Sequence, residues 1–283
     1  MTIDLNPILM LQQVWRYEFM QHAIETSWMI SIVAGVTGYF VVLRRSAFVA
    51  HAYSEIGFAG ASGAILLGVD PLAGLVLGSI VGGVAIAALG RRITNRDTQI
   101  GIVLAFALGL GLLFISLYKA FSTAAISILF GEILGISASE VILTSVAGVG
   151  ILAAMAFLYR PLLFASLDED VAEAKGMPML FISTAFMIVV AVAVSFAVQV
   201  TGVLLIFSLM VTPAATAQYI SMRPNRAILI SVGISLLATQ VGLYVGYFTP
   251  YPVSFFITGI VFFLYLGVRA AHGYVHRRFR EPL

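Results

Sequence analysis

The stretch MLFISTAFMIVVAVAVSFAVQ, residues 179–199, decides the fold class, because it contains no charged side chain from its first residue to its last. A helix needs roughly 20 mostly apolar residues to cross about 30 Å of hydrocarbon, and this stretch has that length. We therefore predict that this part of the chain crosses a lipid bilayer as a helix.

The rest of the chain has the same character. Of its 283 residues, 61% are hydrophobic and 10% are charged, and the mean hydropathy is +1.05. An ordinary soluble domain carries about 25% charged residues. About nine runs have spanning length: 24–43, 48–69, 71–90, 98–117, 139–159, 179–199, 201–221, 227–247 and 252–271. The sequence therefore predicts an all-α, polytopic integral membrane helical bundle with about nine transmembrane helices and no separate soluble domain.

Three parts follow from this pattern: an interfacial N-terminal segment at 1–23, a single transmembrane domain at 24–271, and a basic tail at 272–283. Aromatic residues alternate with charged ones near Trp15, which is typical of an interfacial helix. There is no cysteine, which excludes disulfides and thiolate chemistry. The N-terminus lacks a basic n-region, so we expect no cleavable signal peptide.

Arginines indicate the orientation, because they follow every second span. Cytoplasmic connections are enriched in Lys and Arg, so the alternation predicts an external N-terminus and a cytoplasmic C-terminus. Lys119 is the exception to this alternation. The arginines concerned are Arg44, Arg45, Arg91, Arg92, Arg96, Arg160, Arg223, Arg226, Arg269, Arg277, Arg278 and Arg280.

Two further features concern packing. The run Ala124–Gly135 is too short to span, and we interpret it as a short re-entrant or interfacial helix on the external side. Gly74, Gly78 and Gly82 lie four residues apart, so they share a helix face that a neighbouring backbone can approach closely.

Ionisable groups within the second span suggest a functional site. His51 and Glu55 are four residues apart, so they share one helix face, with Tyr53 and Ser54 as oxygen donors nearby. Imidazole nitrogen and carboxylate oxygen together suit Zn²⁺, Mn²⁺ or Fe²⁺. Two alternatives stay open: the pair satisfies itself as an intramembrane hydrogen bond, or His51 reaches the cytoplasmic interface.

Two other carboxylates fall at the predicted external side. Glu25 stands near the external start of the first span, and Glu132 lies in the short external run. We consider both as the lining of a vestibule through which metal enters. The alternative is that these interfacial carboxylates are simply solvated.

The longest predicted cytoplasmic connection, Arg160–Pro178, carries helix signals. Ser166 and Glu169 have the spacing of a capping box, acidic residues at 168–170 favour a helix start, and Gly176 favours its end. We therefore predict a short helix at about 167–175.

This short helix has a narrow apolar stripe. Leu167, Val171 and Ala174 recur at helical spacing, and the chain offers nothing of its own in the cytoplasm to cover them. A partner protein is one explanation. The alternative is a helix on the membrane surface, although an anionic leaflet would repel its acidic face.

Four stretches of this sequence resemble the permease subunits of the bacterial zinc/manganese/iron ABC uptake family. The stretches are GYFVVLRR at 38–45, the second span from His51 to Gly60, SLDEDVAEAKGMP at 166–178 and TGVLLIFSLMVTPAATA at 201–217. Their order and spacing fit across almost the whole chain.

The resemblance implies partners and a location. It implies a multi-pass protein of the bacterial inner membrane that works with a second permease copy, ABC ATPase subunits and an extracytoplasmic metal-binding protein, and that binds no nucleic acid. In that family the acidic segment ending in Gly-x-Pro is the coupling helix that sits on the ATPase. The positions here that match it include Leu167, Asp168, Glu169, Val171, Ala174 and Gly176.

One departure from the family concerns the metal. The usual pattern in the second span is an Asp followed four residues later by a His, whereas this chain has His51 and then Glu55. The ligand types are kept and their order is reversed. The metal remains one of Zn²⁺, Mn²⁺ or Fe²⁺, carried as a substrate and not held as a cofactor.

The sequence therefore favours the permease subunit of an ATP-driven importer of a divalent transition metal. The chain has no P-loop, so we expect ATP hydrolysis on a partner chain and no enzyme activity here. The alternative is a proton- or sodium-coupled secondary transporter with His51 and Glu55 as the relay. An intramembrane enzyme is disfavoured, because the sequence has no nucleophile elbow and no HExxH motif.

Overall fold

The computed structural model describes residues 15–88, 96–118, 129, 131 and 133–278, and these residues form helices and no strand. The predicted all-α class is therefore confirmed for the described part of the chain. The ten helices are α2 (Glu18–Leu43), α3 (Ala47–Leu66), α4 (Pro71–Ala88), α5 (Arg96–Ser116), α7 (Ala138–Leu167), α8 (Glu169–Ala174), α9 (Met179–Thr201), α10 (Val203–Ile220), α11 (Pro224–Phe248) and α12 (Val253–Arg278).

Nine of these helices overlap the nine apolar runs of the sequence, and α8 is the tenth. Five are long and apolar enough to cross a membrane, namely α2, α7, α9, α11 and α12 within Val253–Tyr274. Shorter apolar helices cover Pro71–Ile86, Ile100–Ser116 and Leu205–Ile220. The number of nine crossings remains a prediction, and most of the predicted external helix at 124–135 lies outside the described residues.

Two helices extend beyond the predicted spans. Helix α2 begins at Glu18, because Met20 and Ile24 are buried against Tyr244 and Tyr247 of α11. Helix α7 does not end at residue 159 but runs through Pro161 to Leu167. Burial of its last turns explains this, since Leu162 and Ala165 belong to the hydrophobic core although a proline inside a helix removes one backbone hydrogen bond.

A single residue separates α9 from α10. Gly202 has φ +80° and serves as the C-cap of α9 and the N-cap of α10. The predicted break at residue 200 is thereby shifted to Gly202, where the positive φ favours glycine. A side chain on Gly131, which also has a positive φ, would meet the Gly202 backbone nitrogen at 2.5 Å, so the two backbones are in close contact.

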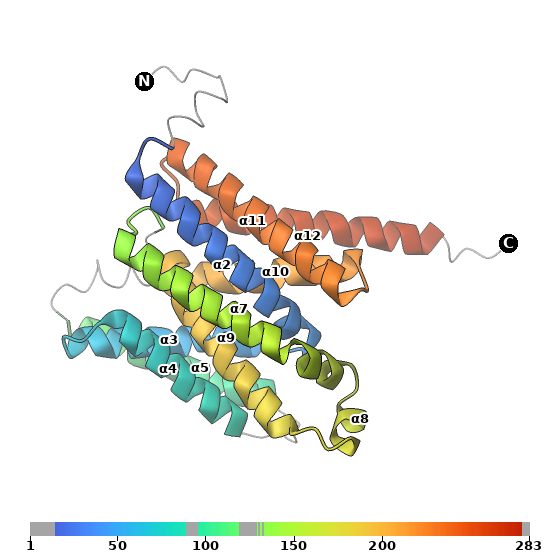
Figure 1. Ribbon diagram of the computed structural model, residues 1–283. Helices are drawn as coiled ribbons and strands as arrows, with labels where there is room; N and C mark the ends of the chain where they lie inside the picture. The colour runs from blue at the N-terminus through green and yellow to red at the C-terminus, as the bar shows by residue number, and fades with distance from the viewer. Residues whose placement is uncertain (1–14, 89–95, 119–128, 130, 132, 279–283) are drawn as a thin grey trace.

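Helices α3, α4 and α5 form one group, and α2, α10, α11 and α12 form another, with α7 and α9 between them (Figure 1). Glycines allow α3 and α4 to approach. A Cβ built on Gly60 would lie 2.2 Å from the carbonyl oxygen of Gly74, and Gly78 and Gly82 also contact α3. The predicted glycine face of α4 is therefore confirmed, because side chains there would separate the backbones.

The outer faces of the bundle are apolar. Phe106 on α5, Phe157 on α7 and Phe263 on α12 are exposed large hydrophobic side chains. In water such surface would be costly, whereas lipid accepts it. In Figure 1, α8 and the end of α12 lie toward one side of the bundle and the start of α2 lies on the other.

Candidate metal pathway and coupling site

Helix α3 positions the two predicted metal ligands. It begins at Ala47 after the N-cap Ser46, so His51 and Glu55 stand in its second and third turns on one face. Glu55 is buried, with 6% of its surface exposed, and His51 is half-buried. The structure therefore places an imidazole and a carboxylate on the same stripe within the protein.

Aromatic rings surround the imidazole. The His51 ring lies 5.0 Å from the Phe207 ring of α10 and 6.5 Å from the Phe48 ring of its own helix, measured between centroids. Rings at this distance exclude water from one side of His51 and hold its orientation. The pair consequently faces the side of α3 that contacts α10.

Neither ligand is fully satisfied by the protein. Within the described residues, Nδ1 of His51 and Oε2 of Glu55 are buried and have no hydrogen-bond partner. A buried polar atom without a partner costs free energy, and a buried carboxylate costs more. No hydrogen bond formed through these two atoms is present in the described structure, so mutual hydrogen bonding through them does not explain the pair.

The two oxygen donors predicted beside this pair have other contacts in the structure. Ser54 Oγ donates to the backbone oxygen of His51 at 2.7 Å, which is a bond within the helix. Tyr53 points to α4, because a Cβ on Gly83 would lie 3.3 Å from its hydroxyl oxygen. Adjacent residues of a helix point in different directions, and their spacing in the sequence does not show which neighbouring helix each side chain contacts.

The described residues contain no group of three or more His, Cys, Asp or Glu side chains near enough to hold a metal ion. His51 and Glu55 thus supply two protein ligands at most in one copy. Zn²⁺ usually takes four ligands, and Mn²⁺ takes more, with oxygen preferred. Water, backbone oxygens or a second copy of the chain have to complete a coordination shell.

The structure describes only one of the two predicted vestibule carboxylates, so the vestibule stays a prediction. Glu25 is exposed on the third turn of α2, and Glu132 lies outside the described residues. A different carboxylate joins two helices near this end of the bundle: Gln199 Nε2 of α9 donates to Glu140 Oε1 of α7 at 3.2 Å. The same Glu140 forms a capping box with Ser137, a pattern that the sequence analysis missed although its S-x-x-E spacing is visible.

The predicted short cytoplasmic helix is present as α8, a helix of six residues. Its expected N-cap was wrong. Asp168, not Ser166, is the N-cap, and its Oδ1 accepts from the Val171 backbone N–H at 3.0 Å. Ser166 lies within the last turn of α7, where its hydroxyl donates to Leu162 O. Because α7 extends to Leu167, the residue predicted to cap the short helix is part of α7 instead. Gly176, with φ +75°, follows the C-cap as predicted.

Helix α8 divides into a packed side and a free side. Ala172 is completely buried in the main hydrophobic core. Leu167, Val171 and Ala174 are exposed, with 69% and 43% exposure for the first two. The three residues predicted for docking are thus uncovered by the described part of the chain. They do not form one stripe as predicted, because Leu167 ends α7 while Val171 and Ala174 belong to α8.

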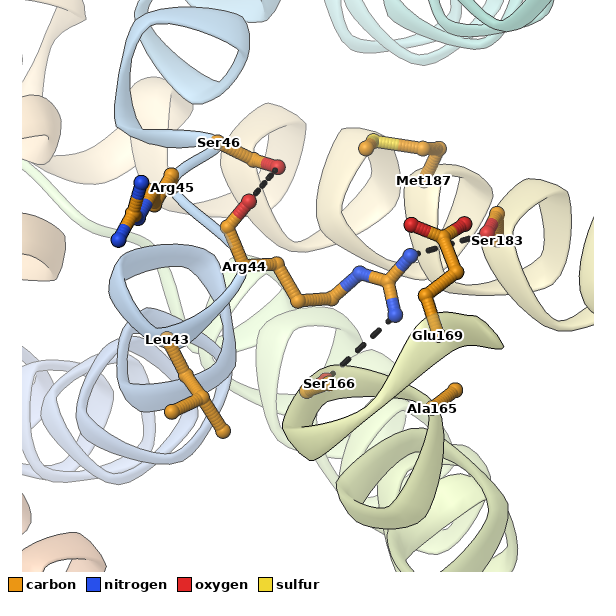
Figure 2. A pocket seen from close by; sticks show the side chains of 9 residues that line it. All are labelled: Leu43, Arg44, Arg45, Ser46, Ala165, Ser166, Glu169, Ser183 and Met187. Carbon is orange, nitrogen blue, oxygen red and sulfur yellow. Dashed lines mark hydrogen bonds between the residues drawn. The ribbon is translucent and has the colours of Figure 1, made fainter. Parts of the chain in front are cut away.

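A polar pocket of about 420 Å³ lies between α8 and the α2–α3 turn. Arg44 extends into it and donates to Ser183 Oγ of α9 at 2.9 Å and to Ser166 Oγ of α7 at 3.5 Å. Figure 2 shows that Glu169 of α8 points toward the Arg44 guanidinium. In the sequence, Arg44 was noted as a topology signal and as part of the GYFVVLRR stretch, with no contact assigned to it, and Ser183 carried no signal at all.

A helical membrane bundle with paired ligand types inside it and a short exposed helix at one end is the arrangement of a membrane transport protein. The chain belongs to the ABC 3 transport family, whose model matches residues 16–271.

Similar proteins support this assignment. The chain is 30% identical over 246 residues to the manganese transport system membrane protein MntC of Listeria monocytogenes, covering 85% of this chain and 86% of that protein. It is 31% identical over 252 residues to the manganese import system permease protein ScaB of Streptococcus parasanguinis, covering 88% and 90%. Among solved structures, PsaBC from Streptococcus pneumoniae in complex with Fab matches with a TM-score of 0.84 and 29% identity over 92% of this chain and 94% of that one.

Proposed function

We propose that the chain is the membrane-spanning permease of an ATP-driven importer of a divalent transition metal. It accepts metal from an extracytoplasmic binding protein, passes it along a path beside His51 and Glu55, and works as a pair of permeases with separate ATPase subunits. The observation that carries the proposal is the buried pair on α3, whose Nδ1 and Oε2 atoms lack hydrogen-bond partners among the described residues. A passing cation supplies the partner that these atoms otherwise lack.

Manganese is the metal that we favour. Both relatives described above carry manganese transport in their names. Chemistry agrees, because one carboxylate and one imidazole form a harder ligand set than the thiolates and multiple histidines typical of tight zinc sites. A two-ligand site also binds weakly, and a transport path requires that metal leave as readily as it enters.

The energy for transport comes from ATP hydrolysis by a partner ATPase that contacts α8. Val171 and Ala174 are exposed apolar residues on α8, whose Ala172 is buried in the core. Leu167 is exposed at the end of α7, just before α8. An anchored helix with one free apolar side suits a docking contact with a partner protein. Family membership and this helix both count against the secondary-carrier alternative, which needs no such contact.

Reconstitution tests the proposal. We expect proteoliposomes containing the permease, its ATPase and its binding protein to accumulate Mn²⁺ only when ATP is supplied on the ATPase side. Zn²⁺ and Fe²⁺ are supplied in parallel to rank the metals. Uptake that follows an imposed proton or sodium gradient and ignores ATP would instead establish the secondary carrier.

A further inference from the structure

The α2–α3 turn is rigidly attached to the helix that carries the candidate ligands. Arg44 is the C-cap of α2, and the Ser46 backbone N–H donates to Val41 O at 2.8 Å while Ser46 Oγ donates to Arg44 O at 3.2 Å. Helix α3 begins at the next residue after Ser46. A shift of Arg44 therefore passes directly into the axis of α3.

The Arg44 side chain contacts the elements on the other side of the pocket. Its guanidinium donates to Ser183 Oγ of α9 and to Ser166 Oγ at the end of α7, and it lies 5.8 Å from the centre of the Phe186 ring. Glu169, the first residue of α8, points toward the same guanidinium (Figure 2). One side chain thus contacts the two long helices that flank α8 in the chain.

We propose that Arg44 is a positioning residue that transmits movement of α8 to the start of α3, so that contact with the ATPase alters the setting of His51 and Glu55. This inference rests on the proposed function, because it assumes that an ATPase acts on α8. The arrangement is a mechanical link with three segments: α8 with the ends of α7 and α9, the Arg44 side chain, and the α2–α3 turn.

The dimensions suit such a link. With a rise of about 1.5 Å per residue, His51 lies roughly 6 Å and Glu55 roughly 12 Å along α3 from Ala47. Both are near enough to the turn that a displacement or rotation there reaches them without intervening flexible residues. Arginine suits the task, because its planar guanidinium donates in several directions at once and is always charged. The lysine ammonium is a single compact charge, so it cannot donate hydrogen bonds in the fixed planar arrangement of a guanidinium.

The neighbouring residue provides a matched control. Arg45 carries the same charge at the same turn, but it is exposed, and Figure 2 shows its side chain pointing away from Ser183 and Glu169. Arg45→Gln therefore removes an arginine from the turn without removing the link. Arg44→Gln removes the link, and Arg44→Lys keeps the charge while losing the planar fork.

The experiment uses the assembled complex of permease, ATPase and binding protein in proteoliposomes. It measures subunit stoichiometry, basal ATP hydrolysis, Mn²⁺ uptake, and the stimulation of hydrolysis by Mn²⁺-loaded binding protein. For Arg44→Gln we expect normal stoichiometry and basal hydrolysis, with about a tenfold fall in Mn²⁺ transported per ATP hydrolysed, the scale set by loss of a charged hydrogen bond. For Arg44→Lys, the amount of Mn²⁺ transported per ATP hydrolysed should lie between the values of Arg44→Gln and the wild type. For Arg45→Gln, it should equal the wild-type value.

Each other outcome is informative. If Arg44→Gln lowers uptake and stimulated hydrolysis in equal proportion, or lowers assembly yield to the same extent, Arg44 is a structural residue and the inference is overturned. Equal effects of Arg44→Gln and Arg45→Gln overturn it as well, because charge at the turn then explains the result. Failure of the proposed function is distinct, since the wild-type complex itself would then show no ATP-dependent uptake.

Discussion

Asp168 Oδ1 accepts the backbone N–H of Val171 at 3.0 Å, and this bond makes Asp168 the residue that starts α8. A helix of six residues has few internal hydrogen bonds, so its cap contributes a large share of its local stability.

The first prediction follows from this cap. Asp168→Ala should destabilise the first turn of α8 by about 1 kcal/mol and weaken coupling to the ATPase. Asp168→Asn should retain most of the wild-type behaviour, because its side-chain oxygen still accepts. Ser166→Ala should leave the cap intact, since Ser166 donates within α7. Hydrogen exchange at the Val171 amide measures the cap, and equal protection in Asp168→Ala and the wild type would show that the bond contributes nothing.

The second prediction concerns the exposed stripe of α8. Val171→Asp places a charge where we propose an apolar contact, so we expect it to release the ATPase subunits or to make their hydrolysis insensitive to metal-loaded binding protein. Val171→Leu keeps an apolar surface and serves as the control. Co-purification stoichiometry and stimulated hydrolysis are the measurements. Normal transport by Val171→Asp would refute the assignment of α8 as the coupling helix.

The third prediction concerns the candidate ligands. His51→Ala and Glu55→Ala should each abolish Mn²⁺ uptake while the permease remains in the membrane with its ATPase, because each removes one of two ligand types from α3. Ser54→Ala is the matched control on the same helix, since its hydroxyl donates only to the local backbone oxygen of His51. Uptake at the wild-type rate by the double variant would reduce the pair to a structural role.

The fourth prediction concerns the contact between α3 and α4. Gly60→Ala should destabilise the fold by about 1–3 kcal/mol, because its new Cβ would lie 2.2 Å from Gly74 O and the backbones must separate. Gly109→Ala on α5 is the control: its Cβ meets no described atom within 4 Å, and alanine favours a helix. Thermal unfolding in detergent compares them, and a melting temperature unchanged by Gly60→Ala contradicts the close approach.

The fifth prediction concerns orientation. The arginine pattern puts Asp70 outside and the exposed residue Met222 in the cytoplasm. Since the chain has no cysteine, a single cysteine introduced at either position is the only thiol in the chain that the reagent can label. An impermeant thiol reagent added to intact cells should label Asp70→Cys and not Met222→Cys. The opposite result would reverse the topology and the direction of import.

Hydrophobicity alone was enough to place the nine long helices, because an apolar run of spanning length has few other stable states. The ends were less predictable. The predicted connection began at Arg160, yet burial of Leu162 and Ala165 extends α7 to Leu167. Ser166 is therefore part of α7, and Asp168 is the N-cap of α8.

The candidate site was predictable only where it is local in sequence. His51 and Glu55 share a face because of their spacing, which is a property of any helix. The Arg44 pocket was not predictable in this way, because its hydrogen bonds join residues 122 and 139 positions apart. Such contacts depend on how α2, α7 and α9 pack, and the sequence pattern of each of these helices does not show which helix lies beside it.

The one-residue connection at Gly202 has a consequence for how the protein is made. Helices α9 and α10 are both apolar, and no loop between them is long enough to remain in water while one helix enters the bilayer ahead of the other. We therefore expect the two to enter the bilayer together as one unit. A residue inserted beside Gly202 should then show its effect during biosynthesis, before any step of transport.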